Sequence, residues 1–442
     1  MRRDRMPRMS PAQRFVALLV AALFVVGAVV AGITVLGDGG ETAATASPTA
    51  TASASQDASA SGTPTAEPSR PTDEEALAIL ADIGARVEEI RGLASADIGP
   101  ADLITREQLG EELRRIFDEE YPAEEREQDN IALRAFGLLE PGQDVAELQL
   151  ELLGEGVLGF YDDNERRMVI VADAGLDALA KLTYAHEYTH ALQDAAFGLD
   201  SLAIDTPGED DRGLARTALQ EGDANATMLA WAFANLTQAE ILELGEIPLP
   251  DTTGIPSWMA AQLDFPYAAG QFWVTQLVGD PLAPDFTAID AAFADPPTST
   301  EQIIHREKWD AREEPIPVDL PDLATALGEG WEEIDSTPVG EASIAIVLEY
   351  FGVSPIDAGL AAEGWGGDRS LVVAHADGDV ALAWRLVWDT PADATEFLDA
   401  YETALDALAF PASVRQLADG AVLVVHASTQ RLHDATLGIA GG

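Results

Sequence analysis

Apolar residues spaced by three and four positions predict helices from about residue 73 onward. Residues 74–91 carry the clearest pattern, because such spacing places every apolar side chain on one helix face. The residues on this face are Leu77, Leu80, Ile83, Val87 and Ile90. Residues 102–120 and 124–139 show similar patterns, so two further helices are expected before residue 140.

A different pattern, alternation of apolar with smaller or polar residues, predicts a half-buried strand over residues 380–388. Its large apolar positions are Val380, Leu382, Trp384, Leu386 and Trp388. Residues 370–375 are expected to form a partner strand, residues 392–408 a helix and residues 421–426 a further strand. The C-terminal region is therefore predicted to be a β-β-α-β subdomain.

A β-hairpin is predicted near the middle of the chain. Residues 159–162 and 168–171 are short runs rich in strand-forming residues, and Asp163 and Asn164 between them favour a turn. The hairpin could line a cleft, where its free edge would pair with an extended peptide, or it could be purely structural.

The N-terminal residues have a pattern of their own. Residues 1–14 carry five arginines and one aspartate, and residues 15–36 are 22 positions without a charge, which is long enough to span a bilayer. We expect a basic cytoplasmic segment, a single membrane anchor and an extracytoplasmic remainder. A cleaved signal peptide is the alternative. Residues 37–72 are nearly all small or polar and are expected to be a disordered linker.

The sequence His-Glu-Tyr-Thr-His at 186–190 indicates a zinc site. At 3.6 residues per turn, His186 and His190 project from the same helix face and can bind one metal ion. Glu187 lies between them and could accept a proton from a zinc-activated water. An amphipathic helix with two histidines by chance is the alternative.

A catalytic zinc site needs a third protein ligand, and the chain has no cysteine to supply one. Glu221 is the best candidate, because it lies in a second apolar-periodic segment where an ionised carboxylate needs a partner. Two histidines and one glutamate leave the fourth tetrahedral position for water. The alternative is an exposed glutamate on an amphipathic helix.

Residues 186–199 followed by Glu221-Gly-Asp-Ala224 resemble the gluzincin metallopeptidases, the thermolysin-like clan. The resemblance implies that Glu221 is the glutamate ligand and that an aspartate one turn further on orients the first histidine. Asn225 stands at that position here, and the nearest aspartate is Asp223. Asn225 could accept a hydrogen bond from His186, whereas Asp223 could do so only if the helix is distorted.

More of the chain resembles a group of largely uncharacterised bacterial and archaeal metallopeptidase-like proteins, through residues 159–171, 265–273, 296–305 and 364–369. In this context Tyr267 and His305 are candidates to stabilise an oxyanion, with core packing or capping as the alternative role. Arg369 could hold a substrate carboxylate, or it could form a turn with Asp368. His375, His426 and His433 are weaker candidates still, and the first two, which lie in apolar strand-like runs, are more simply explained as structural residues.

Composition limits the partners. The net charge of −52 makes nucleic acid an unsuitable partner, because a polyanion would be repelled. The absence of cysteine excludes disulfides, so packing and metal alone must stabilise the fold. The expected partners are a peptide or protein substrate and, through the N-terminal helix, a membrane. Oligomeric state is not predicted.

The predicted fold class is α+β: a zincin-like metallopeptidase domain over residues 73–310, mostly helical with a small sheet, a C-terminal α+β subdomain over 311–442, and one N-terminal transmembrane helix. The predicted function is a membrane-anchored extracytoplasmic metallopeptidase with a zinc cofactor. A catalytically inactive zincin-like binding or scaffold module at the surface is the alternative.

Overall fold

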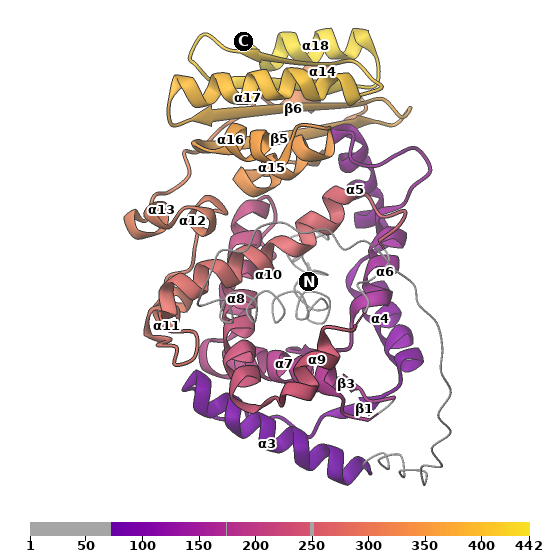
Figure 1. Cartoon of the computed structure of the whole chain (residues 1–442). Coiled ribbons are helices and arrows are strands. Elements are labelled where there is room, and N and C mark those ends of the chain that lie inside the picture. Colours follow the sequence, from indigo (N-terminus) through magenta and orange to yellow (C-terminus); the bar gives the residue numbers. More distant parts are fainter. Residues whose placement is uncertain (1–71, 174, 248–251) are drawn as a thin grey trace, which may run out of the picture.

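The computed structural model describes residues 72–173, 175–247 and 252–442 (Figure 1). The predicted basic segment 1–14, the predicted membrane-spanning helix 15–36 and all but the last residue of the predicted linker 37–72 lie outside the described residues.

The membrane predictions require correction. Within the described part of the chain, no helix combines the length and the apolar character needed to cross a bilayer. The longest, α8, contains Arg216, Glu221 and Asp223 within its span. The fold class that included a transmembrane helix is therefore corrected to a mixed fold of helices and two sheets. The predicted single-pass location at the cell membrane is likewise not supported.

The first two thirds of the described chain are mainly helical. The helices are α3 (Asp73–Arg91), α4 (Arg106–Glu120), α5 (Ala123–Phe136), α6 (Val145–Gly156), α7 (Ala178–Phe197), η1 (Leu199–Leu202), α8 (Asp210–Asn235), α9 (Gln238–Leu244), α10 (Ser257–Val278), α11 (Thr287–Ala294), α12 (Glu301–Ile304) and α13 (Arg306–Ala311). The prediction for residues 74–91 is confirmed: α3 begins in a capping box at Thr72 and ends at Gly92, whose φ of 75° is left-handed. The helix predicted over 124–139 is α5, which stops at Phe136 because Gly137 is also left-handed.

A three-stranded sheet lies among these helices in the order β1-β3-β2 (Asp102–Ile104, Arg167–Val171 and Gly159–Asp162). The predicted hairpin is confirmed, with β2 and β3 antiparallel. The helix predicted from residue 102 is wrong at its start. Residues 102–104 pair with β3 in parallel, and Thr105 then caps α4. Strand β2 is an edge strand.

The C-terminal part forms a five-stranded sheet in the order β4-β5-β6-β8-β7. Its elements are β4 (Trp331–Asp335), β5 (Trp365–His375), β6 (Val380–Trp388), β7 (Ala412–Gln416) and β8 (Val422–Ala427), with helices α14 (Leu323–Leu327), α15 (Gly340–Tyr350), α16 (Pro355–Ala362), α17 (Pro391–Ala404), η2 (Leu405–Ala407) and α18 (Gln430–Ala440). The predicted β-β-α-β order is corrected by the two outer strands: β4 precedes the unit and β7 lies between α17 and β8. All five strands pair antiparallel.

Both faces of this sheet are covered. Leu371, Val373 and Leu423 pack with residues of α14 and α18 on one face. The other face contributes Val372 and Trp384 to a larger core that also contains residues of α5, α10, α15 and α17. Figure 1 shows the sheet at one end of the molecule, with α10 and α15 joining it to the helices below.

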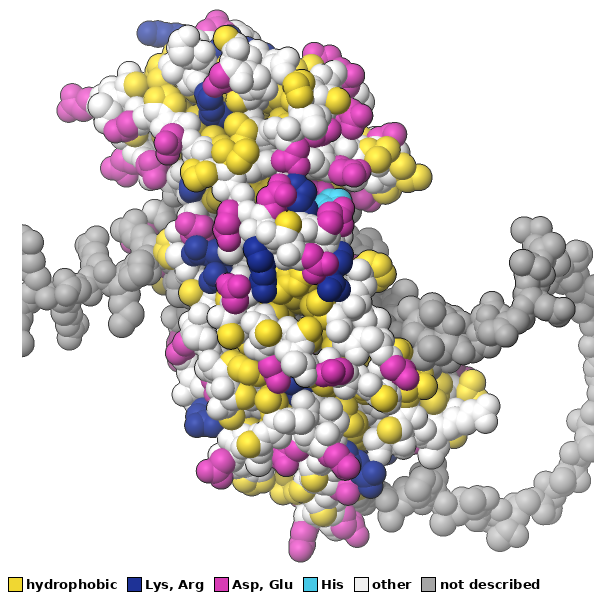
Figure 2. Space-filling model, turned by 90° about the vertical axis from the view of Figure 1, so that its left-hand side faces the viewer, with side chains coloured by type: hydrophobic (Ala, Val, Ile, Leu, Met, Phe, Trp, Pro, Cys, Tyr) yellow, Lys and Arg dark blue, Asp and Glu magenta, His cyan; other side chains and the backbone are white. Residues whose placement is uncertain are grey.

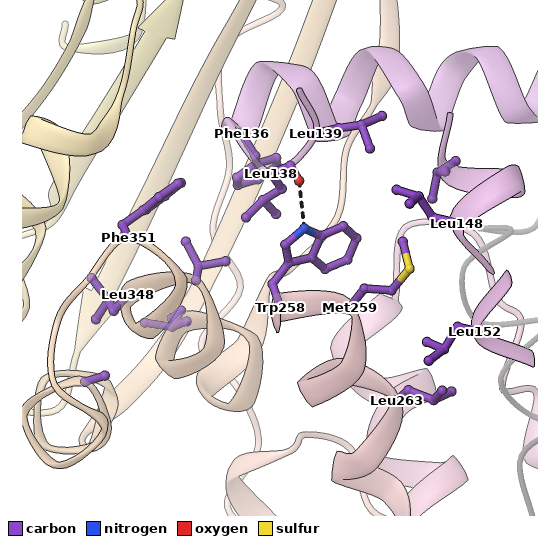
Figure 3. Packing of buried hydrophobic residues seen from close by; sticks show 14 of the residues in the cluster. Phe136, Leu138, Leu139, Leu148, Leu152, Trp258, Met259, Leu263, Leu348 and Phe351 are labelled. Atoms are coloured by element: carbon purple, nitrogen blue, oxygen red, sulfur yellow. Dashed lines mark hydrogen bonds between the residues drawn. The ribbon is translucent and has the colours of Figure 1, made fainter. Parts of the chain in front are cut away.

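The larger core crosses the predicted domain boundary at residues 310 and 311. Figure 3 shows Trp258 of α10 between Leu138 and Met259, with its indole N–H donating to the Leu138 carbonyl over 2.7 Å. Leu348 and Phe351, at the end of α15, belong to the same core. The division into two domains stays a prediction, and the two parts share buried apolar side chains.

The surface carries the charge excess. On the face shown in Figure 2, acidic side chains are spread from end to end, while several Lys and Arg side chains gather near the middle.

Candidate metal centre

Helix α7 presents the first two donors. Asp177 caps it by accepting a hydrogen bond from the Ala180 N–H over 2.8 Å, and no charged residue interrupts the apolar flanks of the motif. Twelve consecutive residues around the motif, Leu182 to Gln193, are buried. His186 and His190 therefore project from one face of a buried helix, as their spacing predicts.

Helix α8 presents the third donor. It packs against α7 on one side and very closely against α10 on another, where Gly222 and Gly270 allow the two backbones to meet. A Cβ on Gly222 would lie 2.4 Å from the carbonyl oxygen of Gly270. Glu221, next to this contact, is only 1% exposed and faces the two histidines.

The three donor atoms converge. The Oε2 atom of Glu221 lies 3.0 Å from Nε2 of His186 and 3.4 Å from Nε2 of His190, and the two Nε2 atoms are 3.0 Å apart. The structure thus brings together the three residues predicted as metal ligands, which lie 35 positions apart at most.

This arrangement fits zinc. Donors at roughly 2.0–2.1 Å from a tetrahedral ion lie about 3.3 Å from one another, close to the separations between these atoms. Imidazole nitrogen and carboxylate oxygen are ordinary zinc ligands, and three protein donors leave one position open. Glu221 supplies the carboxylate of this donor set, and Glu187 is the neighbouring carboxyl group that could act as a base.

Electrostatics favour an ionised Glu221. Burial acts to raise its pKa, but the neighbouring His190 and His186 outweigh this effect and lower the pKa. The pKa of His190 is raised, because Glu221 and Glu187 outweigh the opposing effect of burial. Without a metal, the Glu221 carboxylate is therefore paired with a protonated His190, and a cation would take the place of that proton.

Glu187, the predicted base, lies beside the cluster and is 4% exposed. Its Oε2 accepts a hydrogen bond of 2.9 Å from the backbone N–H of Tyr161 in β2. Burial raises the pKa of Glu187 to about 8, against an opposing effect of His190. In the β2–β3 register, Gly159 and Tyr161 turn their backbone groups away from β3, so this edge of β2 faces α7.

His190 has a support that the sequence did not predict. Its Nδ1 lies 2.9 Å from Oε1 of Gln193, one turn further along α7. The Gln193 amide group donates in turn to Asp223, over 2.8 Å. Asp223 therefore assists the second histidine, His190, through Gln193. The resemblance implied an aspartate one turn after Glu221 that orients the first histidine, and Asp223 does not have that role. The i+3 spacing of Gln193 from His190 was the available signal.

His186 is supported more loosely. Its Nδ1 and the Oδ1 of Asn225 are both buried and without a hydrogen-bond partner of normal geometry among the described residues. Burial lowers the pKa of His186, while Glu221 and Asn225 act in the opposite direction. Asn225 also donates from Nδ2 to the Tyr267 carbonyl over 3.4 Å.

The two candidate oxyanion stabilisers differ in position. Tyr267 of α10 is buried, and its ring stacks on that of His186 with centroids 6.2 Å apart. His305 lies between α12 and α13, and its Nε2 is 2.7 Å from Oε1 of Glu341 in α15. This hydrogen bond raises the pKa of His305. Tyr267 therefore adjoins the metal ligands, whereas His305 is held by Glu341.

The Gly364–Arg369 motif has a structural explanation. Arg369 donates from NH1 to the backbone carbonyls of Gly208 and Ser336. Asp368 is buried and accepts from the N–H groups of Val339 and Gly340 at the start of α15. Neither the substrate-carboxylate role nor an Asp368–Arg369 lock describes these contacts.

The remaining three histidines, His375, His426 and His433, make contacts with neighbouring side chains and backbone within the C-terminal part and α5. His375 pairs with Asp377 at a strand end, and His433 lies 2.8 Å from the Ser413 hydroxyl. His426 is buried between the Tyr401 hydroxyl and the Ala135 carbonyl.

A second carboxylate group, Glu301, Glu313 and Asp389, also has closely spaced oxygens. Lys308 lies at its centre, with Nζ 3.1 Å from Glu301, 2.5 Å from Glu313 and 2.6 Å from Asp389. The ammonium group of Lys308 pairs with all three carboxylates, so we describe this cluster as an ion-pair network.

Comparisons with known proteins inform the C-terminal part alone. Residues 327–436 match a family model described as Domain of unknown function (DUF8575). The match covers the five-stranded sheet and does not reach α7 or α8. No curated protein and no solved structure matches the chain.

Proposed function

We propose that this protein is a zinc-dependent metallopeptidase that hydrolyses peptide bonds in peptide or protein substrates. One observation carries the proposal: His186, His190 and Glu221 place three metal-binding atoms within 4.8 Å of one another, and the carboxyl group of Glu187 adjoins them. A purely structural site would have no use for Glu187.

When bound, zinc would supply Lewis-acid polarisation of the scissile carbonyl and lower the pKa of a water toward about 7. His186, His190 and Glu221 would hold it. Glu187 accepts the proton of the attacking water and passes it to the leaving amine, so no net proton is consumed at this residue. Burial raises the pKa of Glu187 to about 8 in the metal-free site, and a bound cation would lower this pKa and so favour the carboxylate that accepts the proton.

Tyr267 is the candidate donor to the developing oxyanion. Helix α10 positions its ring beside that of His186. A phenol O–H that donates to the developing oxyanion would stabilise the transition state more than the substrate.

Strand β2 is the candidate substrate-binding edge. Its backbone groups at Gly159 and Tyr161 face α7, and an extended peptide can bind such an edge by strand addition. The tie between Tyr161 and Glu187 places this edge beside the proposed base.

The deciding experiment measures the metal content of the full chain by elemental analysis after dialysis, for the wild type and for Glu221→Ala. We expect one zinc per chain, lost or strongly weakened in the variant. A folded wild-type protein that binds no zinc would overturn the proposal.

Activity is tested with a peptide mixture and the variant Glu187→Gln. The expected outcome is retained zinc and loss of hydrolysis, since the amide cannot accept the proton. Glu349→Gln, the same chemical change at an exposed position of α15, serves as the control and should leave hydrolysis unchanged. Equal hydrolysis by wild type and Glu187→Gln would exclude this base.

The second candidate function, an inactive zincin-like binding or scaffold module, is favoured by one observation. Glu187 is buried and already accepts the Tyr161 N–H, so it is partly withdrawn from a substrate water. Zinc binding by the wild type without hydrolysis of any peptide in the mixture would support this function instead.

A further inference from the structure

We propose that Arg91 is a positioning residue for the metal ligand His190, acting through Asp223 and Gln193. This inference deepens the proposed function and rests on it for the role of His190. It also assigns to α3, a helix more than 90 residues away in sequence from the motif, a part in the metal centre.

The inner part of the chain of contacts fixes the direction of one amide group. Nε2 of Gln193 donates to Asp223 Oδ2 over 2.8 Å and to the Gln220 carbonyl over 3.0 Å. Both partners are acceptors, so the Gln193 NH₂ must face them and its oxygen must face His190. All of these side chains are buried.

The direction of this amide selects the tautomer of His190. A carbonyl oxygen 2.9 Å from Nδ1 requires a proton there, so in the neutral or metal-bound ring it is Nε2 that has its lone pair toward His186 and Glu221. The Gln220 NH₂ approaches the same Nδ1 but is more distant, at 3.4 Å. The nearer acceptor therefore determines the proton position.

Arg91, the last residue of α3, fixes Asp223 from the other side. Its Nε lies 2.8 Å from Asp223 Oδ1, and both side chains are completely buried. A second ion pair of 2.8 Å links its NH2 to Asp290, and the guanidinium lies over the ring of Phe286 with a centroid distance of 4.5 Å. Because arginine is always a donor, the atom facing it at position 223 must be an acceptor.

These contacts predict opposite outcomes for the single variant Asp223→Asn and for a double variant that also replaces Arg91. In Asp223→Asn, Arg91 would claim the amide oxygen, so the new NH₂ would face the NH₂ of Gln193. The Gln193 amide then keeps the Gln220 carbonyl alone to hold its oxygen toward His190. In the double variant Arg91→Met/Asp223→Asn, the new amide is free to turn its oxygen toward Gln193, and the carboxylate that loses its ion pair with Arg91, Asp290, is 46% exposed.

The test measures zinc dissociation constants of the full chain by competition with a chelator. We expect zinc affinity to fall about 10–100-fold in Asp223→Asn and to return to within about threefold of wild type in the double variant. Gln193→Met, which is uncharged and similar in volume, should show the same loss as Asp223→Asn and carries the test if that variant does not fold.

A second measurement does not require metal. Nitrogen NMR shifts of the histidine rings in the metal-free chain, recorded at a pH above the raised pKa of His190 so that its ring is neutral, report which ring nitrogen carries the proton. We expect Nδ1–H for His190 in the wild type and in the double variant, and a shift toward Nε2–H in Asp223→Asn. Tyr401→Phe, which removes a buried hydrogen bond from His426, is the control and should change neither measurement.

The inference is overturned if Asp223→Asn and Gln193→Met leave both measurements unchanged, or if the double variant binds zinc no better than Asp223→Asn. Failure of the proposed function would look different. A wild type that binds zinc and hydrolyses nothing would leave these affinity and tautomer differences in place.

Discussion

Glu187 shows how burial can prepare a single side chain for proton transfer. Its carboxyl group loses hydration in the closed surroundings of α7 and β2, which raises its pKa to about 8. The pKa of His190, three positions further along α7, is raised by the carboxylates around it. The acid and base properties of the site therefore arise from the neighbours of each residue and not from residue type alone.

Tyr267→Phe tests the proposed oxyanion donor. We expect kcat to fall roughly 10²–10³-fold with zinc content unchanged, because the hydroxyl would contribute only when charge develops in the transition state. Steady-state kinetics on a cleaved peptide measure this effect. A similar fall in the control Tyr401→Phe, which removes a buried hydroxyl in α17 of the C-terminal part, would attribute the loss to general destabilisation.

Among individual residues, the sequence predicted those that a local motif marks. The spacing of His186, Glu187 and His190 indicated that they lie close together on one helix, and Glu221 stood out as a charged residue in an apolar-periodic segment. The contacts of Arg91 with Asp223 could not be predicted, because they join residues 132 positions apart and nothing in either segment marks the partner. The use of Gln193 depends in turn on where Asp223 lies.

Helices α8 and α10 illustrate how elements hold the site together. Ala218 and Gly222 of α8 meet Gly270 of α10 at backbone distance, so the helix that carries Glu221 is locked to the helix that carries Tyr267. A Cβ on Gly270 would lie 2.2 Å from the Ala218 carbonyl oxygen. Backbone atoms cannot yield as a flexible side chain would.

Gly270→Ala should therefore destabilise the protein by about 1–3 kcal/mol, because the helices must separate to admit the methyl group. Urea unfolding measures the change. Gly110→Ala is the matched control: Gly110 lies within α4 with open space around its Cβ position, and alanine there should stabilise by up to about 1 kcal/mol. Equal effects of the two substitutions would contradict the close crossing of α8 and α10.

The three strands that the sequence pattern did not predict, β1, β4 and β7, are all short and lack a clear alternation of buried and exposed residues. β1 is three residues long and was included in a helix, because apolar spacing over so short a segment fits either structure. β4 and β7 are outer strands with several exposed or half-buried positions, so they lack the alternation seen in β6. The long periodic segments, α3 and β6, agree with their predicted bounds to within one residue.

At the scale of the whole molecule, the charge of −52 opposes compaction through mutual repulsion. Raising NaCl from about 0.05 to about 0.5 M should increase Tm, since the screening length falls well below the molecular diameter. Differential scanning calorimetry measures the shift, and choline chloride at equal ionic strength should give a similar one. A stabilisation specific to sodium would indicate bound ions in place of screening.

His426 links the two parts of the molecule and makes stability depend on pH. It donates from Nδ1 to the Ala135 carbonyl of α5 and accepts from Tyr401, and burial lowers its pKa to about 4 from the ordinary 6.5. Between these values the unfolded chain binds a proton and the folded chain does not. The stability present above pH 6.5 is therefore lost as the pH falls through this window.

The comparison of wild type with His426→Gln isolates this effect. Between about pH 7.5 and about pH 5, the unfolding free energy of the wild type should fall by about 2 kcal/mol more than that of the variant, which cannot titrate at this position. Urea unfolding at both pH values provides the measurement. Parallel losses in the two proteins would show that other groups account for the acid sensitivity.

The hydrogen bond from Tyr161 to Glu187 has a consequence for catalysis under the proposed function. A peptide that adds to β2 needs the Tyr161 N–H for its own pairing, so its arrival would release the carboxyl group that the strand had held. Recognition of an extended chain and liberation of the base would be a single event. Fragments too short to reach β2 would leave the base restrained, and selection for chain length would be expressed in turnover more than in affinity.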